Sequence, residues 1–342
     1  MLDKQPAGLV GYSPPTFCFV VHALSRLHRG IMGVPSMRMG LIGQWRDGTA
    51  MDDVLPVCHV GLGGGIMGAV VGVPMTPTDL LSDQQRAVDH MVEAVALAGP
   101  VSAVGLGSLC AVVGGRGEAL ASRLNVPVTN GGAATAWALL ANVRTVLAQR
   151  GERRVAIIGS RSPIGLAVAQ ALAEDGIHVR VDHRRAAKAG DVEACSGPLE
   201  AVEGCQVIVG CGPTGGVLPA DAVSPGAVVV DVAIPSTVVG RPHGSVVQLA
   251  GEAVALPPGW RRGFWGWLYH VLSGYGPSQV FACLIEPLVL AASGRDRPYS
   301  LGRALTAADV TEFGQQAEAL GFKPRLAQGW TAFPPERLLL DG

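Results

Sequence analysis

The chain has 342 residues, of which 49% are hydrophobic and 15% are charged, so it can bury a large core and is not a disordered protein. This length suggests about two domains. The net charge of −1 at pH 7 gives no general attraction to nucleic acid or to an anionic membrane, and we expect neither as a main partner.

The cysteine pattern and the first residues of the chain favour a location in the cytoplasm. The seven cysteines are an odd number and include no CxxC pair, which favours reduced thiols over disulfides. Residues 1–15 lack a basic start followed by a continuous apolar stretch, so no signal peptide is predicted. The histidines show no spacing typical of metal ligands. We therefore expect a cytoplasmic protein that binds no metal ion.

The N-terminal part of the chain predicts buried strands. Residues 17–22 form an apolar run that ends in His22. Residues 54–73 are apolar enough to suggest a transmembrane segment, but Pro56 and the glycines at 63–65 favour two strands joined by a turn. We expect no transmembrane segment here.

Helices and a short strand are predicted next. Apolar residues at helical spacing predict a helix over 79–97 with Asp79 as its cap. Residues 101–106 read as a short strand, which Gly107 and Ser108 follow, and residues 133–149 read as a long apolar helix.

The pattern changes near residue 150. Apolar runs then alternate with connections of helix length, and each run ends in glycine or aspartate. This is typical of an α/β protein with a Rossmann-type doubly wound parallel sheet. We expect a dinucleotide-binding domain at 150–250, and a second α/β domain built from residues 1–149 and 251–342.

The turn after residue 158 is the predicted phosphate-binding turn. Gly159 permits a tight turn, Gly165 lets the following helix pack closely, and the helix N-terminus can bind a pyrophosphate. The middle glycine of the GxGxxG motif is absent, with Arg161 and Ser162 in its place. A structural βαβ unit without a cofactor is the alternative.

The end of the second strand predicts the cofactor. Asp182 lies 23 residues after Gly159 and favours NAD through the ribose hydroxyls, whereas Arg184 and Arg185 favour the 2′-phosphate of NADP unless they are simply solvated. We expect NADPH, with NADH as a possible substitute. The complete set of predicted cofactor-binding residues is Gly159, Ser160, Arg161, Ser162, Pro163, Ile164, Gly165, Asp182, Arg184, Arg185, Cys211, Gly212 and Asp231.

Three C-terminal segments, at 278–286, 299–303 and 321–324, resemble the C-terminal region of the cyanobacterial-type long-chain acyl-(acyl carrier protein) reductases. Segments at 19–22, 104–108 and 128–137 and the turn at 159–165 are also similar to that family, so the resemblance spans roughly residues 17–325. It implies the NADPH-dependent reduction of an acyl thioester, carried by acyl carrier protein or coenzyme A, to an aldehyde. The domain outside the Rossmann unit would then bind the acyl group.

The resemblance implies that Cys283 is the acylated nucleophile. A thiolate can attack a thioester, and the expected position of Cys283 near the start of a helix over 280–290 would lower the thiol pKa. The alternative is a buried cysteine that only packs. Glu286, one helical turn later, could position a proton.

His22 and Ser108 are the other predicted catalytic residues. His22 could transfer a proton and Ser108 could donate to a thioester oxygen. Each also has a structural interpretation, as a core histidine and as a helix cap. Two other functions remain open: a non-covalent NAD(P)-dependent dehydrogenase of the shikimate, amino-acid or methylene-tetrahydrofolate type, and a nucleotide-binding protein without catalysis.

Overall fold

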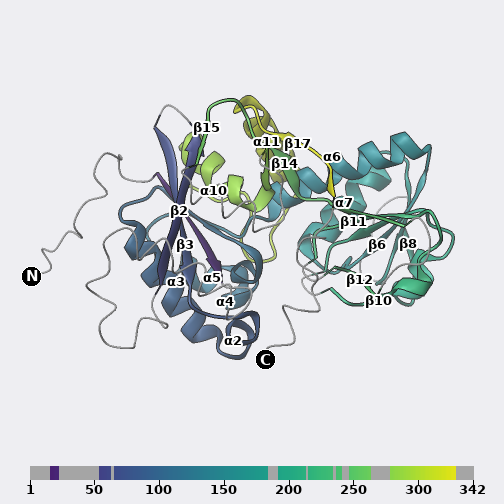
Figure 1. Cartoon of the computed structure of the whole chain (residues 1–342), viewed down its shortest axis with the longest axis horizontal. Helices are drawn as coiled ribbons and strands as arrows, with labels where there is room; N and C mark the ends of the chain where they lie inside the picture. Colours follow the sequence, from purple (N-terminus) through teal and green to yellow (C-terminus); the bar gives the residue numbers. More distant parts are fainter. Residues whose placement is uncertain are drawn as a thin grey trace, which may run out of the picture.

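The computed structural model describes residues 16–22, 54–62, 65–183, 192–212, 215–233, 236–240, 246–262 and 278–328. Arg184 and Arg185 lie outside these residues. Within the described residues, no helix combines the length and the apolar character needed to cross a membrane. Two α/β lobes lie side by side (Figure 1).

The first lobe is built on a six-stranded sheet in the order β15-β2-β3-β1-β4-β5. Its strands are β1 (Phe17–His22), β2 (Leu55–Leu62), β3 (Ile66–Val73), β4 (Ala103–Leu106), β5 (Val128–Thr129) and β15 (Trp260–Arg262). β1 is buried along its whole length and pairs in parallel with β3 and β4, which explains its continuous apolar run. β2 and β3 are antiparallel neighbours with Leu62 opposite Ile66, so the predicted strand pair is confirmed.

The helices around this sheet differ in one respect from the prediction. The expected single helix over 79–97 is two helices, α2 (Pro77–Ser82) and α3 (Gln84–Ala98). Thr76, not Asp79, is the N-cap of α2, and Asp83 breaks the helix because its side chain accepts a hydrogen bond from the Arg86 amide and caps α3. The remaining helices of this lobe are η3 (Ser108–Ala111), α4 (Val113–Arg116), α5 (Glu118–Ala121), α10 (Ala282–Ser293) and α11 (Ala307–Ala319).

The second lobe contains a seven-stranded sheet in the order β18-β13-β11-β9-β6-β7-β8. Its strands are β6 (Arg154–Ile158), β7 (His178–Val181), β8 (Val192–Ala194), β9 (Val207–Gly210), β11 (Val228–Asp231), β13 (Val247–Ala250) and β18 (Ala327–Gln328). All pairs are parallel except the edge strand β18, and the parallel strands follow the 3-2-1-4-5-6 order of the doubly wound dinucleotide-binding sheet. The predicted fold class is confirmed.

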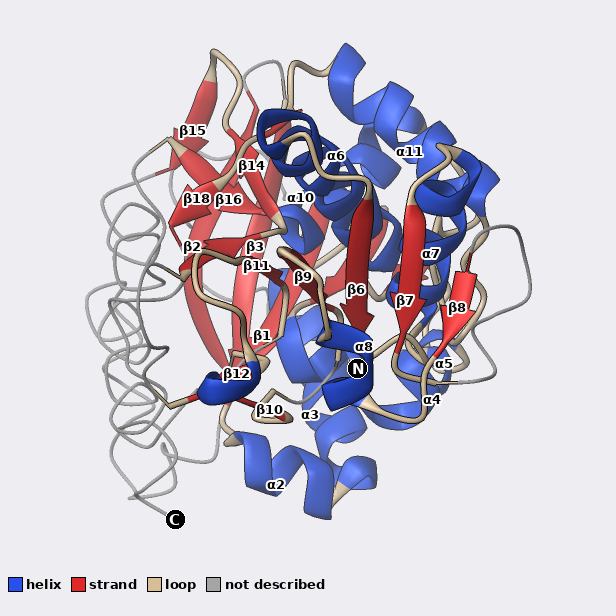
Figure 2. Cartoon of the chain, turned by 90° about the vertical axis from the view of Figure 1, so that its right-hand side faces the viewer, coloured by secondary structure: helices blue, strands red, loops and turns tan. Residues whose placement is uncertain are grey.

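Figure 2 faces this Rossmann lobe and shows β6, β7 and β8 running side by side in one direction, with α7 beside them. The smaller elements include two short sheets, β10 with β12 and β14 with β16 and β17. The remaining bounds are α7 (Pro163–Glu174), α8 (Pro198–Val202), η5 (Ala220–Ala222), β10 (Leu218–Pro219), β12 (Val238–Val239), β14 (Ala253–Ala255), β16 (Gln279–Phe281) and β17 (Lys323–Pro324).

Helix α6 (Gly132–Arg150) joins the two lobes. It packs against α7 and β11 of the Rossmann lobe and against α10 and α11 of the first lobe. A single apolar core continues through it, from Phe17 in β1 past Leu139 in α6 to Val209 in β9. The two lobes therefore share one apolar core through α6.

Candidate active site

A cleft between the lobes is lined by both of them. The first lobe contributes the ends of β1 and β4 and the starts of α6 and α10, and the Rossmann lobe contributes the start of α7 and the ends of β9 and β11. The structure brings together in this cleft the predicted site residues His22, Ser108, Ser162, Pro163, Ile164, Cys211, Gly212 and Cys283.

The turn before α7 is built on two glycines that cannot be replaced without a clash. Gly159 has a φ of +81°, and a Cβ on it would lie 2.6 Å from the Cα of Gly212. A Cβ on Gly165 would lie 2.8 Å from the carbonyl oxygen of Gly159. Ser162 caps α7 by accepting a hydrogen bond from the Gly165 amide at 2.9 Å. The ends of β6 and β9 thus meet at the switch point of the sheet, where such folds bind dinucleotides.

Asp182 follows β7 as predicted, but its carboxylate points into this turn. It accepts hydrogen bonds from the Gly159 amide at 2.7 Å and from the Ser160 amide and hydroxyl at 3.0 and 2.5 Å. In this conformation the carboxylate orders the turn instead of being presented to a ribose. Arg161 and Ile164 are left as the amides of the turn that can donate to a ligand.

Asp231 and Cys211 also form hydrogen bonds to other residues of the Rossmann lobe. The Asp231 carboxylate accepts hydrogen bonds from the Ala233 amide and from the Ser236 and Thr237 side chains, and so holds the loop after β11. The Cys211 amide donates to the carbonyl of Ile158 at 2.7 Å, and burial raises the pKa of its thiol. These bonds hold the loops that follow β9 and β11.

Cys283 is the second residue of α10, half-buried, and it lies in the cleft against Gly131. The pKa of its thiol is raised from 9.0 to about 12, first by burial and then by the nearby carboxylates of Glu252 and Glu286, while a backbone hydrogen bond at Ser108 opposes them. The predicted lowering of this pKa is therefore wrong. The helix N-terminus contributes less than the loss of solvation.

Glu286 does not line the cleft. It is fully buried, and its carboxylate accepts hydrogen bonds from the Ser300 hydroxyl at 2.7 Å, the Ala134 amide at 2.8 Å and the Thr129 hydroxyl. Ala134 lies in the first turn of α6, so Glu286 caps that helix from outside. We predicted that Glu286 positions a proton for Cys283. These hydrogen bonds go to other residues, so they do not support that role.

His22 and Ser108 lie at the same end of the cleft. His22 is 4% exposed, and its Nε2 accepts a hydrogen bond from the Leu109 amide at 3.3 Å, which helps hold the turn that begins η3. Ser108 is exposed and has a φ of +51°, which is strained for a residue with a side chain. The backbone at Ser108 is the part that contacts Cys283.

Sequence reasoning missed Glu252, Asn130 and Arg116, which also line the cleft. Glu252 is 6% exposed and comes just after β13. The rule that ligands bind beyond the carboxyl ends of parallel strands, applied to this strand as to the others, would have selected it. No sequence signal distinguishes Arg116 from the other arginines.

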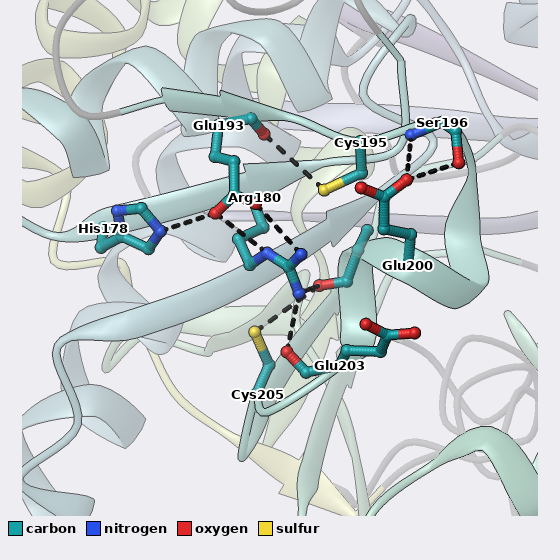
Figure 3. Close-up of polar contacts among 9 residues, drawn as sticks. His178, Arg180, Glu193, Cys195, Ser196, Glu200, Glu203 and Cys205 are labelled. Carbon is teal, nitrogen blue, oxygen red and sulfur yellow. Dashed lines mark hydrogen bonds and ion pairs between the residues drawn. The ribbon is translucent and has the colours of Figure 1, made fainter.

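A second polar cluster surrounds Arg180 on β7 and Glu193 on the edge strand β8 (Figure 3). None of the residues labelled there lines the cleft. Arg180 donates two hydrogen bonds of 3.1 Å to Glu193 and one of 2.7 Å to the carbonyl of Glu203. His178 contacts the same Glu193 carboxylate at 2.9 Å. The charges of this cluster pair within it, which is typical of a structural role. In the described residues, no group of three or more potential ligands could hold a metal ion.

No protein-family model matches the chain. Among curated proteins, the chain is 29% identical over 277 residues to the aminotransferase PigE of Serratia sp. (strain ATCC 39006). That match covers 75% of this chain and 32% of PigE, so the chain spans about a third of the length of this relative.

Similar solved structures are dehydrogenases and a malic enzyme. They include a dehydrogenase from Rhizobium meliloti (21% identity, 42% of this chain and 57% of that one, TM-score 0.25). A 5,10-methylenetetrahydrofolate dehydrogenase from Bombyx mori (17%, 69% and 80%, 0.28) and an NAD-dependent malic enzyme from Thermotoga maritima (14%, 68% and 65%, 0.33) are also similar. Likenesses this distant assign no activity to the chain.

These comparisons correct the family prediction. The curated relative reported above is an aminotransferase, so the predicted membership of the acyl-(acyl carrier protein) reductases is wrong. The prediction depended on short segments of glycine turns and apolar helix starts. Such segments recur in unrelated α/β proteins, because many connections from a strand to a helix use them.

Proposed function

We propose that this chain is an NAD(P)-dependent oxidoreductase of the non-covalent dehydrogenase type, which acts on a carbonyl or alcohol substrate in the cleft between its lobes. The observation that carries the proposal is the meeting of the Gly159 turn and Gly212 at the switch point of a 3-2-1-4-5-6 sheet, directly beside the cleft. A bound nicotinamide dinucleotide supplies or accepts a hydride.

The residues of the turn would hold the cofactor. The amides of Arg161, just before the N-cap of α7, and of Ile164 in its first turn would donate to a pyrophosphate, and Gly212 would allow close approach of the nucleotide. NADPH remains the proposed cofactor, because the engagement of Asp182 by the turn removes one acceptor that would favour NAD. His22, in the cleft on the opposite lobe, would transfer the proton that accompanies the hydride.

A covalent reaction at Cys283 is the second candidate, favoured by the position of its thiol in the same cleft. The Cys283 thiolate would add to the carbonyl carbon of an acyl thioester of acyl carrier protein or coenzyme A. The carbon–sulfur bond to the carrier would break, the carrier thiol would leave with a proton, and the acyl group would remain on Cys283. The raised pKa of the thiol weighs against this candidate, because only the thiolate attacks.

Aminotransferase activity, which the name of the Serratia relative states, is not proposed for this chain. Pyridoxal phosphate chemistry needs a lysine that forms a Schiff base. The chain has three lysines, of which Lys4 and Lys188 lie outside the described residues and Lys323 is exposed on β17, not in the cleft. The described part of the cleft therefore does not fit this cofactor.

The first experiment measures NADPH and NADH binding by fluorescence titration of the wild type and of Gly159→Ala. The variant is expected to lose binding, because its Cβ would meet Gly212. Gly176→Ala is the matched control: its φ is +72°, but only the flexible end of Arg153 lies near its Cβ, so it carries the backbone strain without the clash. Binding of neither nucleotide by a folded wild type would refute the proposal.

The second experiment separates the two candidates. Intact-mass measurement after incubation with acyl thioesters, without nucleotide, detects an acyl group on the wild type and its absence in Cys283→Ala if the reaction is covalent. Retention of turnover by Cys283→Ala supports the dehydrogenase. A protein that binds NADPH but reduces or oxidises no carbonyl, alcohol or thioester substrate would be a nucleotide-binding protein without catalysis.

A further inference from the structure

Two arginines from distant parts of the chain lie near each other beside the cleft, and Gly302 and Ala304, the neighbours of Arg303, line it. Arg116 lines the cleft at the end of α4, and Arg303 lies in the segment that follows Ser300. The Gly302 amide donates to the carbonyl of Arg116 at 3.1 Å, so the two segments run together. The Nη2 of Arg303 donates to the carbonyl of Arg161 at 3.0 Å, which connects the first lobe to the turn of the Rossmann lobe.

Asn130 connects the segments that carry Arg116 and Arg303. Its side-chain amide donates at 3.2 Å to the carbonyls of both Arg116 and Gly302. Arg116 has a φ of +60°, a left-handed conformation that costs free energy for a residue with a Cβ. The strained backbone of Arg116 and the like charges of Arg116 and Arg303 therefore lie close together.

The two guanidinium groups are not neutralised within the described part of the chain. No carboxylate there forms an ion pair with Arg116 or Arg303, although Glu118 lies against Gly302. Burial and the charge of Arg303 lower the pKa of Arg116. Arg180 is the contrast, because Glu193 accepts two of its hydrogen bonds. A negatively charged ligand bound between them would relieve the repulsion between Arg116 and Arg303.

The N-terminus of α7 adds positive electrostatic potential to that of the two arginines. Arg161 directly precedes Ser162, the N-cap of this twelve-residue helix, so Arg303 lies beside the positive end of the helix dipole. Ser162, Pro163 and Ile164 at this end of the helix line the cleft. Guanidinium groups bind phosphate oxygens with paired hydrogen bonds, whereas a carbonyl substrate without charge would leave both arginines unneutralised.

We propose that Arg116 and Arg303 form a phosphate-binding site, which closes the first lobe over a ligand bound at the turn before α7. The inference rests on the proposed function for the place of the cofactor, and it adds that the ligand carries a phosphate on the side of the first lobe. That phosphate has two sources, the pyrophosphate of the dinucleotide or a phosphate of the substrate, and both are the same chemistry to the two arginines.

The test is isothermal titration of the full chain with inorganic pyrophosphate, NADPH and coenzyme A. The variants are Arg303→Gln and the double variant Arg116→Gln with Arg303→Gln. Arg153→Gln is the matched control, since Arg153 is also exposed and also donates from Nη2 to a carbonyl, that of Gly176 at 3.3 Å. Thermal unfolding of each variant checks that the chain remains folded.

The wild type and Arg153→Gln are expected to bind pyrophosphate, and each lost guanidinium is expected to weaken binding about tenfold. A parallel loss for NADPH assigns the phosphate to the cofactor, and a loss for coenzyme A with unchanged NADPH binding assigns it to the substrate. If the wild type binds pyrophosphate but not NADPH, and the double variant loses pyrophosphate, the inference stands and the proposed function fails. Equal pyrophosphate binding by the wild type and the folded double variant, or none by the wild type, overturns the inference.

Discussion

The carboxylate of Glu286 accepts a hydrogen bond of 2.8 Å from the backbone amide of Ala134, a residue 152 positions earlier in the chain. This bond joins α10, which carries Cys283, to the first turn of α6, which links the lobes. The relative position of Cys283 and the Rossmann lobe therefore depends on a buried helix cap.

Removal of this cap should destabilise the whole chain. Glu286→Ala removes the acceptor of the Ala134 amide and of the Ser300 hydroxyl and leaves the Thr129 hydroxyl the Ser300 carbonyl as an acceptor, so we expect it to lower the free energy of unfolding by about 2–4 kcal/mol. Urea denaturation measures this. Glu174→Ala, at an exposed site on α7, is the control and should change the free energy by less than about 0.5 kcal/mol. Equal effects of the two substitutions would contradict the capping role.

The Cys283 thiol should react slowly at neutral pH. Its pKa is raised from 9.0 to about 12, so the neutral form dominates below that pH, and the thiolate fraction grows as the pH rises toward 12. At pH 8 we expect alkylation by iodoacetamide about a thousandfold slower than for a thiol of unshifted pKa. Peptide mass spectrometry, with Cys283→Ala as the blank, follows the rate between pH 7 and 10. A rate that is already maximal at pH 7 would show that the thiol is a thiolate in solution.

Gly131 and Gly151 flank the two ends of α6 and offer a matched pair. Both have a positive φ, of +75° and +66°, but a Cβ on Gly131 would lie 2.5 Å from the Cβ of Cys283, whereas nothing lies within 4 Å of one on Gly151. We expect Gly151→Ala to cost about 1 kcal/mol and Gly131→Ala about 2–4 kcal/mol in thermal or urea unfolding. Adding Cys283→Gly, but not Cys283→Ala, should recover part of the difference, because only glycine removes the Cβ, while the Cα of residue 283 would still lie 3.0 Å away.

The cluster around Arg180 should affect stability without affecting the cleft. Arg180→Leu removes the donor to the carbonyl of Glu203 and leaves Glu193 with only His178 beside it. We expect a loss of about 2–3 kcal/mol of unfolding free energy. The dissociation constant of NADPH, measured at a temperature where both proteins are folded, should stay within twofold of the wild type's. A large rise in this constant would connect the cluster to the site.

The amino-acid sequence by itself determined the Rossmann sheet and the glycine turn between β6 and α7. Apolar runs that end in glycine specify parallel strands buried on both faces, and Gly159 and Gly165 are needed for local reasons, a left-handed φ and a close contact within one turn. These properties depend on neighbours a few residues away, so a linear pattern reveals them. The same local logic failed for Asp83, where a cap broke one apparent helix into two.

Only the tertiary structure decided what the polar side chains do. Asp182 turns back to Gly159, Glu286 caps α6, and the surroundings of Cys283 raise its pKa instead of lowering it. Each outcome depends on partners tens to hundreds of positions away and on how much water packing removes. A carboxylate or a thiol takes its role from those partners, because hydrogen bonds and solvation at the folded site outweigh the local preference of the residue.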